Sequence, residues 1–151
     1  MIADEVLRSF DKSNCVVTGG TGMIGREVVR LLCEAGANVR CVSLDNITVH
    51  PKAEHVYADL SDFSTCKEIT KDMDHVFHVA GIKGSVEVTK SKPASFLVPI
   101  LMMNTNMMEA ARVNKAKRVV YTSTIGAYAA AEVYKEEDYS ESQPPMDHYP
   151  G

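Results

Sequence analysis

One short stretch near the N-terminus limits the folds open to this chain more than any other. Thr18 to Gly25 reads Thr-Gly-Gly-Thr-Gly-Met-Ile-Gly and directly follows the apolar run Cys15-Val16-Val17. Apolar residues then recur at helical spacing as far as Gly36, which makes the context a strand, a glycine turn and a helix. The glycines allow a tight turn and a close approach of backbone to phosphate, and amides at a helix start attract anions. The stretch therefore predicts a dinucleotide-binding turn; the alternative is an ordinary strand-to-helix turn.

Beyond this turn, segments typical of strands and helices alternate along the chain. Strands are expected at residues 38–44, 55–58, 74–80 and 117–123, and helices at residues 2–10, 61–71 and 93–113. Gly36 is the expected stop of the helix after the glycine turn, Ser61 is a candidate N-cap, and Pro99 is expected to disturb the long helix. Such alternation implies parallel pairing and right-handed crossovers. We predict an α/β fold: a doubly wound, Rossmann-type parallel sheet with helices on both faces, incomplete at the C-terminus.

Length, charge and cysteine content exclude several classes of protein. The 151 residues are enough for one domain with its own core. The formal net charge of −4 indicates neither a nucleic-acid nor a membrane partner. The sequence has no signal-peptide pattern, and no apolar run approaches the roughly 20 residues that span a bilayer. Cysteines at positions 15, 33, 41 and 66 form no Cys-x-x-Cys pair, so we expect reduced core thiols, no metal site and a cytoplasmic location.

The glycine stretch, with Val-Thr-Gly before it and Met-Ile-Gly within it, resembles the extended short-chain dehydrogenase/reductase family. That family includes the nucleotide-sugar epimerases, dehydratases and reductases. The resemblance implies that NAD or NADP lies on the carboxyl ends of the strands. In the turn, the cofactor-binding residues are then Gly19, Gly22, Met23, Ile24 and Gly25.

The ends of the next three strands carry further residues similar to the family's cofactor contacts. The family's acidic ribose-binding position aligns with Ser43, and Asp45 follows two residues later; Asp45 favours NAD, whereas a serine with a nearby arginine suits NADP. Asp59-Leu60 resembles the pair that contacts adenine, although Asp59 is also a candidate loop or cap residue. The remaining contacts implied are Val79, Ala80 and Gly81, in a segment similar to His-x-Ala-Ala, and Lys83, similar to a lysine of the GDP-fucose synthase subgroup or a solvated loop lysine. We expect His78 to be a hydrogen-bonded structural histidine.

Catalytic residues are implied by the end of the fifth strand and by the C-terminal segment. Tyr121-Thr122-Ser123-Thr124 resembles the family's hydroxyl segment, so Thr124, or else Ser123, would polarise the reacting sugar oxygen; the alternative is a threonine in a strand-end turn. Tyr149 stands 25 residues after Thr124, at the family's interval for the tyrosine that exchanges a proton. The family's lysine four residues later would be residue 153, beyond the last residue of the sequence.

The long helix supports the resemblance and also departs from it. Asn106-Met107-Met108-Glu109-Ala110-Ala111 is similar to the family's Asn-x-x-x-Ala-Ala pattern, and the resemblance implies a homodimer through the 93–113 helix. Met103, Met107 and Ala110 share one face, which indicates core or dimer contact. The family's active-site asparagine aligns with Ile100, and the cysteine of the GDP-fucose synthase subgroup aligns with Gly126.

We therefore interpret residues 1–151 as the N-terminal NAD(P)-binding Rossmann domain of a longer enzyme whose substrate lobe is absent here. The expected parent is an NAD(P)-dependent epimerase, dehydratase or reductase that acts on a nucleotide sugar by hydride transfer, with NAD favoured over NADP. The fragment alone is expected to be inactive. Two alternatives stay open: an NAD(P)H-dependent reductase of a hydroxysteroid or flavonoid-type carbonyl, and a non-catalytic NAD(P)-sensing module.

Overall fold

The computed structural model describes residues 4–124, 128, 132–133 and 135. The strands of this part are β1 (Asn14–Thr18), β2 (Asn38–Ser43), β3 (Glu54–Tyr57), β4 (His75–His78) and β5 (Arg118–Tyr121), and the helices are α1 (Asp4–Arg8), α2 (Met23–Glu34), α3 (Phe63–Ile69), α4 (Val86–Ser91) and α5 (Ala94–Val113). The chain divides into two units: Met1–Gly81 with Met102–Tyr121 form the first, and Ile82–Leu101 with Thr122–Gly151 form the second. Each unit is described by itself.

All five strands belong to one parallel sheet in the first unit, in the order β3-β2-β1-β4-β5. Thr18, the last residue of β1, pairs with Val42 on one side and with His78 on the other, and His78 pairs with Tyr121. The carboxyl ends of these strands therefore form one row. The chain leaves β1 towards β2 and returns to pair β4 on the opposite side, which makes the β1/β4 boundary the point where strand order reverses. Open α/β sheets bind ligands at this switch point.

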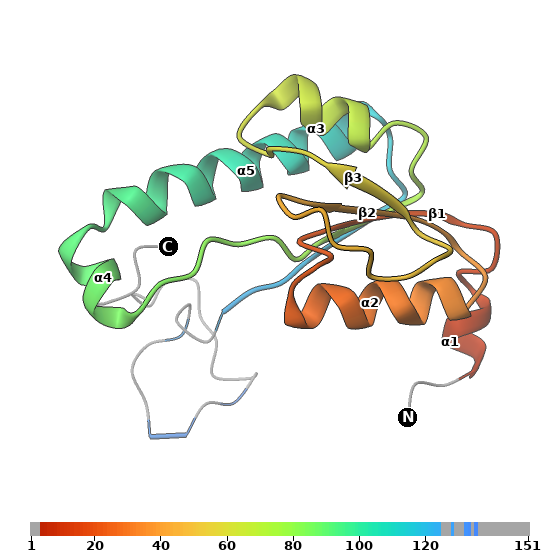
Figure 1. The fold of residues 1–151 in the computed structure, drawn as a ribbon, viewed down its shortest axis with the longest axis horizontal. Coiled ribbons are helices and arrows are strands. Elements are labelled where there is room, and N and C mark those ends of the chain that lie inside the picture. The colour runs from red at the N-terminus through yellow and green to blue at the C-terminus, as the bar shows by residue number, and fades with distance from the viewer. Residues whose placement is uncertain (1–3, 125–127, 129–131, 134, 136–151) are drawn as a thin grey trace. The chain divides into compact units, whose positions relative to one another are not determined.

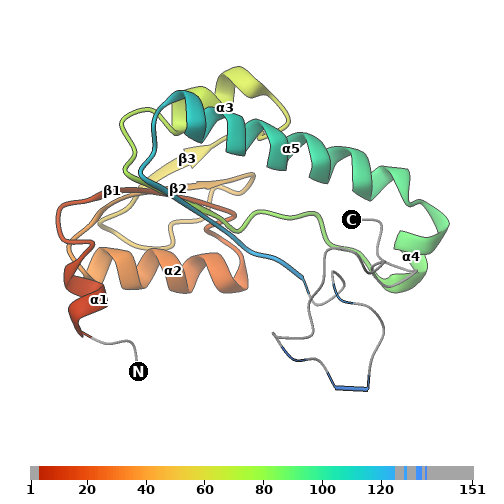
Figure 2. The same cartoon turned by 180° about the vertical axis from the view of Figure 1, so that it is seen from behind.

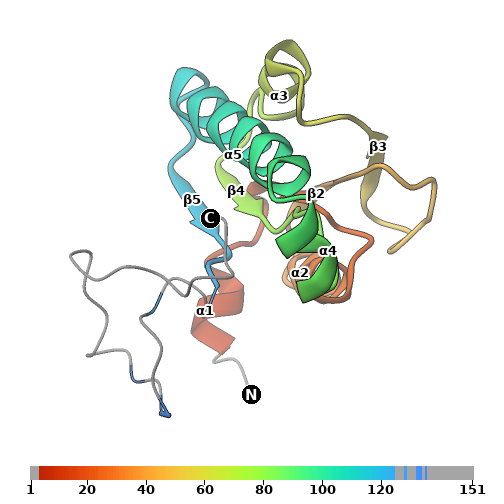
Figure 3. The ribbon, with the colours of Figure 1, turned by 90° about the vertical axis from the view of Figure 1, so that its left-hand side faces the viewer.

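Alternation along the strands gives the sheet two buried faces, as a doubly wound fold requires. Val16, Val42 and Val76 pack against α3 and the C-terminal part of α5, with Met107 and Ala110 fully buried there. Figures 1 and 2 show α3 and the C-terminal part of α5 on the face of the sheet opposite α2, and Figure 3 shows these helices end-on. The residues that pack on the α2 face are Cys15, Val17, Val29, Leu32, Cys33, Val39 and Cys41. The predicted doubly wound sheet with helices on both faces is confirmed.

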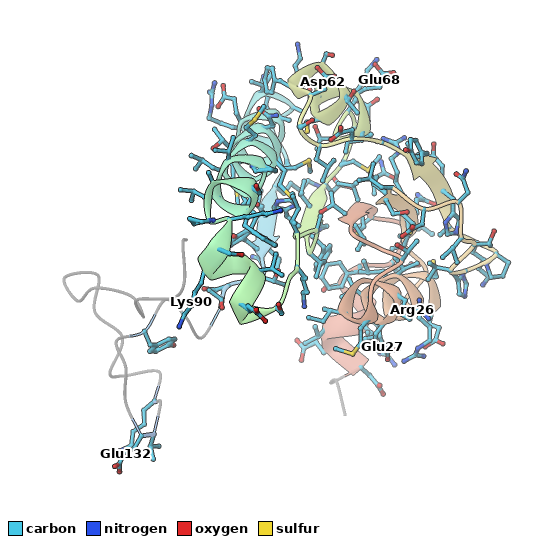
Figure 4. The ribbon with its side chains drawn as sticks, turned by 60° about the vertical axis from the view of Figure 1, so that its left-hand side comes forward. Arg26, Glu27, Asp62, Glu68, Lys90 and Glu132 are labelled. Carbon is cyan, nitrogen blue, oxygen red and sulfur yellow. The ribbon has the colours of Figure 1, made fainter. Side chains whose placement is uncertain are left out.

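Local chemistry explains where α2 and α3 begin and end. Gly36, the expected stop of α2, has φ +87°, a left-handed conformation that ends helices readily. For α3 the expected N-cap was wrong: Asp62 caps the helix, and its carboxylate accepts a hydrogen bond from the Thr65 amide at 2.7 Å. Ser61 instead donates its amide to Asp59 Oδ1 at 2.9 Å, so it belongs to the preceding turn. Figure 4 labels Asp62 at the start of this helix.

The strands are shorter at their carboxyl ends than the sequence predicts, because the chain there leaves the ladder to build loops. The fourth strand was expected to reach residue 80, but its ladder ends at His78. The second unit contains α4, which the sequence analysis did not predict; Ser85 caps it through the Val88 amide at 3.3 Å. Pro99 lies inside α5, which is assigned as one helix of 20 residues, so the proline does not break it.

Candidate functional site

The glycine turn connects β1 to α2 at the switch point, and its fit depends on missing side chains. Gly19 has φ +66°, and a Cβ there would lie 2.8 Å from Cα of Ala80. A Cβ on Gly25 would collide with the carbonyl oxygen of Gly19. The turn is therefore closed tightly on the α2 side and on the β4 side, which is the packing role expected of the first and third glycines.

Gly22 differs from Gly19 and Gly25 because a Cβ there would meet one atom within 4 Å rather than several. The single close atom to a Cβ at this position is the Gly19 carbonyl oxygen at 3.2 Å. Gly22 is also the N-cap of α2 and gives no side-chain cap. The first helical bond runs from the Arg26 amide to the Gly22 oxygen at 3.0 Å, so the amides of Met23, Ile24 and Gly25 are not used by the helix ladder. The result is a helix start with open backbone donors, suited to a phosphate.

The end of β2 reaches the same turn. Thr21 Oγ1 donates to Asp45 Oδ2 at 2.9 Å, which places this carboxylate beside the glycine turn. Ser43 Oγ donates to the carbonyl oxygen of Asp45 at 2.9 Å and accepts from its amide at 3.3 Å, which holds the bend at the end of β2. Arg26, labelled in Figure 4 near the start of α2, donates from Nη2 to the Thr21 oxygen at 2.7 Å. Thr21 thus bonds both a carboxylate, that of Asp45, and a guanidinium, that of Arg26.

The loop after β3 is tied down by side chains. Asp59 is exposed, and its carboxylate holds the Ser61 amide, as the loop interpretation of this residue expects. Leu60 is buried, and its carbonyl oxygen accepts from Asn106 Nδ2 at 3.1 Å. Asn106 also donates to the Ser61 oxygen at 2.9 Å, so α5 fixes the course of this loop.

The end of β4 is built around a buried histidine. His78 has no exposed surface, and its Nδ1 lies 2.7 Å from Thr18 Oγ1 while its Nε2 lies 2.9 Å from Asn104 Oδ1. Burial lowers the pKa of His78 below its ordinary 6.5, against the bond to Asn104, which raises it. The expectation that His78 is hydrogen-bonded is confirmed, and its structural role stays a prediction.

After His78 the chain passes directly over the end of β1. The Val79 amide donates to the Thr18 carbonyl oxygen, and the Ala80 amide donates to Thr18 Oγ1, both at 3.3 Å. A Cβ on Gly81 would meet nothing within 4 Å. The structure thus brings the 79–81 segment and the glycine turn together at the switch point.

The remaining predicted residues belong to the second unit or lie outside the described residues. Lys83, Ser123 and Thr124 are exposed and belong to the second unit, as does Ile100. Tyr149 and Gly126 lie outside the described residues. Their roles stay predictions.

Several residues of this edge were missed by the sequence analysis. Thr18, Thr21 and Arg26 lie in the glycine turn or directly beside it. The interpretation of this stretch rested on its glycines and gave no role to these polar residues. Asn104 and Asn106 reach the ends of β4 and β3 from α5. The presence of two asparagines in a methionine-rich helix was an available signal, because asparagine side chains that become half-buried need hydrogen-bond partners.

The cysteine side chains are buried thiols, which makes them poor nucleophiles. All four are free and buried. Burial raises the pKa of Cys15 to about 12 and that of Cys66 to about 11, so both remain thiols at neutral pH.

The described residues contain no group of three or more His, Cys, Asp or Glu that could hold a metal ion. None of the described helices is long and apolar enough to cross a membrane.

Comparison with known proteins identifies the family. The family model described as the NAD dependent epimerase/dehydratase family matches residues 15–150. The chain belongs to that family. A GDP-mannose 3,5-epimerase of Oryza sativa subsp. indica is 28% identical over 124 residues, which cover 78% of this chain and 32% of the rice enzyme. A 3 beta-hydroxysteroid dehydrogenase/Delta 5-->4-isomerase of Mycobacterium tuberculosis is 32% identical over 117 residues, or 72% of this chain and 31% of that protein.

Among solved structures, MoeE5 in complex with UDP-glucose and NAD aligns with a TM-score of 0.78 and 26% identity, covering 91% of this chain and 44% of its own. This epimerase/dehydratase chain therefore spans about a third of the two curated relatives and less than half of the solved protein. Family membership and the Rossmann-type fold agree with the sequence analysis.

Proposed function

We propose that the chain is the cofactor-binding part of an NAD-dependent epimerase or dehydratase that acts on a nucleotide sugar. One observation carries the proposal: at the switch point, the Gly19 turn closes against Ala80 and leaves the amides at the start of α2 open. This arrangement suits a dinucleotide pyrophosphate. The family match and the MoeE5 complex with UDP-glucose and NAD support the chemistry.

Different residues at this edge would bind different parts of the cofactor. Gly22 would let the pyrophosphate approach the backbone, and the amides of Met23, Ile24 and Gly25 would bind it. Asp59 and Leu60 would border the adenine. The 79–81 segment would support the cofactor over the end of β1, and Lys83 is a further candidate contact. When bound, the nicotinamide accepts and returns a hydride.

The position of Asp45 favours NAD over NADP. Thr21 orients its carboxylate beside the turn, where it can accept hydrogen bonds from the ribose hydroxyls of NAD. The same charge repels the 2′-phosphate of NADP. Arg26 lies on the other side of Thr21 and would attract that phosphate if the carboxylate were absent.

The catalytic proposal rests on residues outside the first unit. Thr124, or else Ser123, would donate a hydrogen bond to the reacting sugar oxygen. Tyr149 would exchange the proton of that oxygen as hydride moves, which requires its phenol pKa to be lowered from near 10. We also propose a homodimer through α5, as the resemblance implies.

A hydroxysteroid substrate is the second candidate. It is favoured by the 32% identity to the mycobacterial 3 beta-hydroxysteroid dehydrogenase. Two assays on protein of the relatives' full length separate these candidates. Conversion of UDP-sugars and GDP-sugars is followed by chromatography of the products, because epimerisation and dehydration return the hydride and form no net NADH. Oxidation of 3β-hydroxysteroids is followed by NADH formation. A protein that binds NAD and turns over none of them would be a sensing module.

The direct test of the cofactor site is Gly22→Val. A Cβ at Gly22 meets one atom, the Gly19 oxygen at 3.2 Å, and its φ of −72° suits valine, so stability without ligand should fall much less than in Gly25→Val. For wild type, NAD at 100 times its Kd should stabilise the fold by about 2.7 kcal/mol, and the variant should lose this shift because the side chain occupies the phosphate position. Gly25→Val is the contrast, since its collision with Gly19 should lower stability without ligand. An undiminished NAD-induced shift in Gly22→Val would exclude the proposed site.

A further inference from the structure

A chain of hydrogen bonds crosses the carboxyl edge of the sheet beneath the proposed cofactor site. It begins at Tyr121, whose hydroxyl accepts from Asn104 Nδ2 at 2.9 Å. Asn104 Oδ1 then bonds His78 Nε2, and His78 Nδ1 bonds Thr18 Oγ1. Thr18 Oγ1 also accepts from the Ala80 amide. One amide side chain on α5 is thereby connected to the ends of β5, β4 and β1.

The donors and acceptors in this chain determine one another. With Asn104 Oδ1 facing it, His78 Nε2 must carry the ring proton. A neutral ring then leaves Nδ1 as an acceptor, which takes the proton of the Thr18 hydroxyl. The Thr18 oxygen keeps its lone pairs for the Ala80 amide. His78 and Thr18 have no exposed surface, so water cannot replace these partners and an incorrect tautomer would leave a buried group unsatisfied.

The end of this hydrogen-bond chain coincides with the close contact between the 79–81 segment and the glycine turn. Ala80, held by Thr18, is the residue whose Cα and amide would lie 2.8 Å from a Cβ on Gly19. A small displacement of Ala80 therefore alters the surface against which the Gly19 turn closes. Burial lowers the pKa of His78, which keeps the ring neutral at physiological pH and Nδ1 an acceptor.

We propose that Asn104 is a positioning residue for the cofactor: by fixing the Nε2–H tautomer of His78 it orients the Thr18 hydroxyl and holds the 79–81 segment against the glycine turn. The part of this proposal that concerns cofactor binding rests on the proposed function. Asn104 bonds His78 and Tyr121, and in this proposal it acts through His78 and Thr18.

The test compares Asn104→Leu with Asn114→Leu. Asn114 is also half-buried and also makes two side-chain hydrogen bonds, both donated by Nδ2, to the Lys67 oxygen at 2.7 Å and to Thr70 Oγ1 at 2.8 Å. It lies at the C-terminal ends of α3 and α5, away from the carboxyl edge. Both variants lose comparable hydrogen bonds, so a merely structural role predicts the same consequences for both. Asn104→Ala serves if Asn104→Leu does not fold.

Two readouts need no cofactor. Nitrogen-15 NMR of the His78 ring should show protonated Nε2 and bare Nδ1 in wild type and in Asn114→Leu, and a changed tautomer mixture in the Asn104 variant. Hydrogen exchange of the Ala80 amide should accelerate in the Asn104 variant and not in Asn114→Leu. A wild-type tautomer and an unchanged exchange rate in the Asn104 variant would overturn the proposal.

The third readout uses NAD as the probe. The Kd should rise about tenfold in the Asn104 variant, the order expected when a buried hydrogen bond is lost, and stay within about twofold in Asn114→Leu. In the double variant Thr18→Val/Asn104→Leu the rise should be no larger than in Thr18→Val alone, because both act through one bond to Ala80. Equal NAD affinity in the Asn104 and Asn114 variants would refute the positioning role. If wild type binds neither NAD nor NADP, the proposed function fails, and the tautomer and exchange measurements still decide what Asn104 does.

Discussion

Gly20 shows how closely a single residue of the turn is fitted to the sheet. Its missing side chain leaves room for Sγ of Cys41 on β2, and a Cβ there would collide with that sulfur. The other near atoms, Val29 Cγ2 at 3.4 Å and Cys41 Cβ at 3.5 Å, are at ordinary contact distance. The conflict is therefore confined to one atom pair.

Gly20→Ala should destabilise the protein by about 1–3 kcal/mol, the usual range for overpacking a core. Adding Cys41→Ala should recover part of this loss, because it removes the sulfur that the new methyl group meets. Urea unfolding of the two single variants and the double variant measures the coupling. Cys15→Ala is the matched control: Cys15 is buried in the same cluster and does not contact Gly20, so its combination with Gly20→Ala should be additive. Additivity for Cys41 would contradict the packing argument.

Asp45 carries the prediction about cofactor choice. Asp45→Ser should move the ratio of NADP to NAD affinity towards NADP by at least about tenfold, because a charged hydrogen-bond acceptor for the ribose is lost and Arg26 remains nearby. The two Kd values, measured by titration, give the ratio. Asp59→Ser is the control, since adenine is common to both cofactors and the ratio should not change. A ratio unaffected by Asp45→Ser would remove Asp45 from the ribose site.

Among the elements, α3 gives a sharp test of how local chemistry fixes a helix start. Ser61 and Asp62 are both residue types that cap helices, and they are adjacent. The structure assigns the cap to Asp62, whose Oδ2 bonds Ser64 Oγ, Thr65 Oγ1 and the Thr65 amide. The pKa of Asp62 is lowered to about 2, first by the bond from Ser64 and then by those from Thr65.

Asp62→Ala should lower the thermal midpoint by a few degrees, the usual effect of losing an N-cap in a domain of this size. Ser61→Ala should leave the midpoint nearly unchanged, because its amide rather than its hydroxyl makes the recorded bond. Differential scanning calorimetry of both variants at neutral pH decides the matter. Equal midpoints for the two variants would mean that the cap contributes nothing to stability.

For the molecule as a whole, a buried neutral histidine makes stability depend on pH. Burial lowers the pKa of His78, and also that of His75, below 6.5 in the folded state. As pH falls through and below 6.5, the unfolded chain takes up protons that the folded chain does not, so the free energy of unfolding decreases. The carboxylates with lowered pKa values, such as Asp74, add their own loss at more acidic pH.

His78→Gln should flatten this dependence between pH 7 and about 5, leaving the smaller slope that His75 supplies with the same sign. The measurement is the free energy of unfolding by urea at several pH values for both proteins. The slope is diagnostic even if the substitution lowers stability at every pH. An unchanged slope would show that His78 is protonated in the folded state as readily as in the unfolded one.

Much of the fold could be predicted because its determinants are local in sequence. The strand, glycine turn and helix around Gly19 to Gly25 are encoded in a dozen successive residues, and the alternation of strands with helices implies a parallel sheet. The same local pattern indicated that Gly36 ends α2. Boundaries were less accurate: the β4 ladder stops at His78 because its neighbour β1 ends at Thr18, where the chain turns at Gly19 (φ +66°), and the Ala80 amide bonds the Thr18 hydroxyl instead.

The partners of the polar side chains could not be predicted, because they depend on which strand ends become neighbours. Thr18 and His78 are 60 residues apart, and only the order β2-β1-β4 places them side by side. Asn104 and Tyr121 join them from another helix and strand, since parallel pairing aligns all carboxyl ends at one edge. The sequence by itself determined the dinucleotide-binding pattern and the class of fold. Tertiary structure alone decided which buried donors and acceptors meet, because a buried polar group must find its partner in space wherever the chain supplies it.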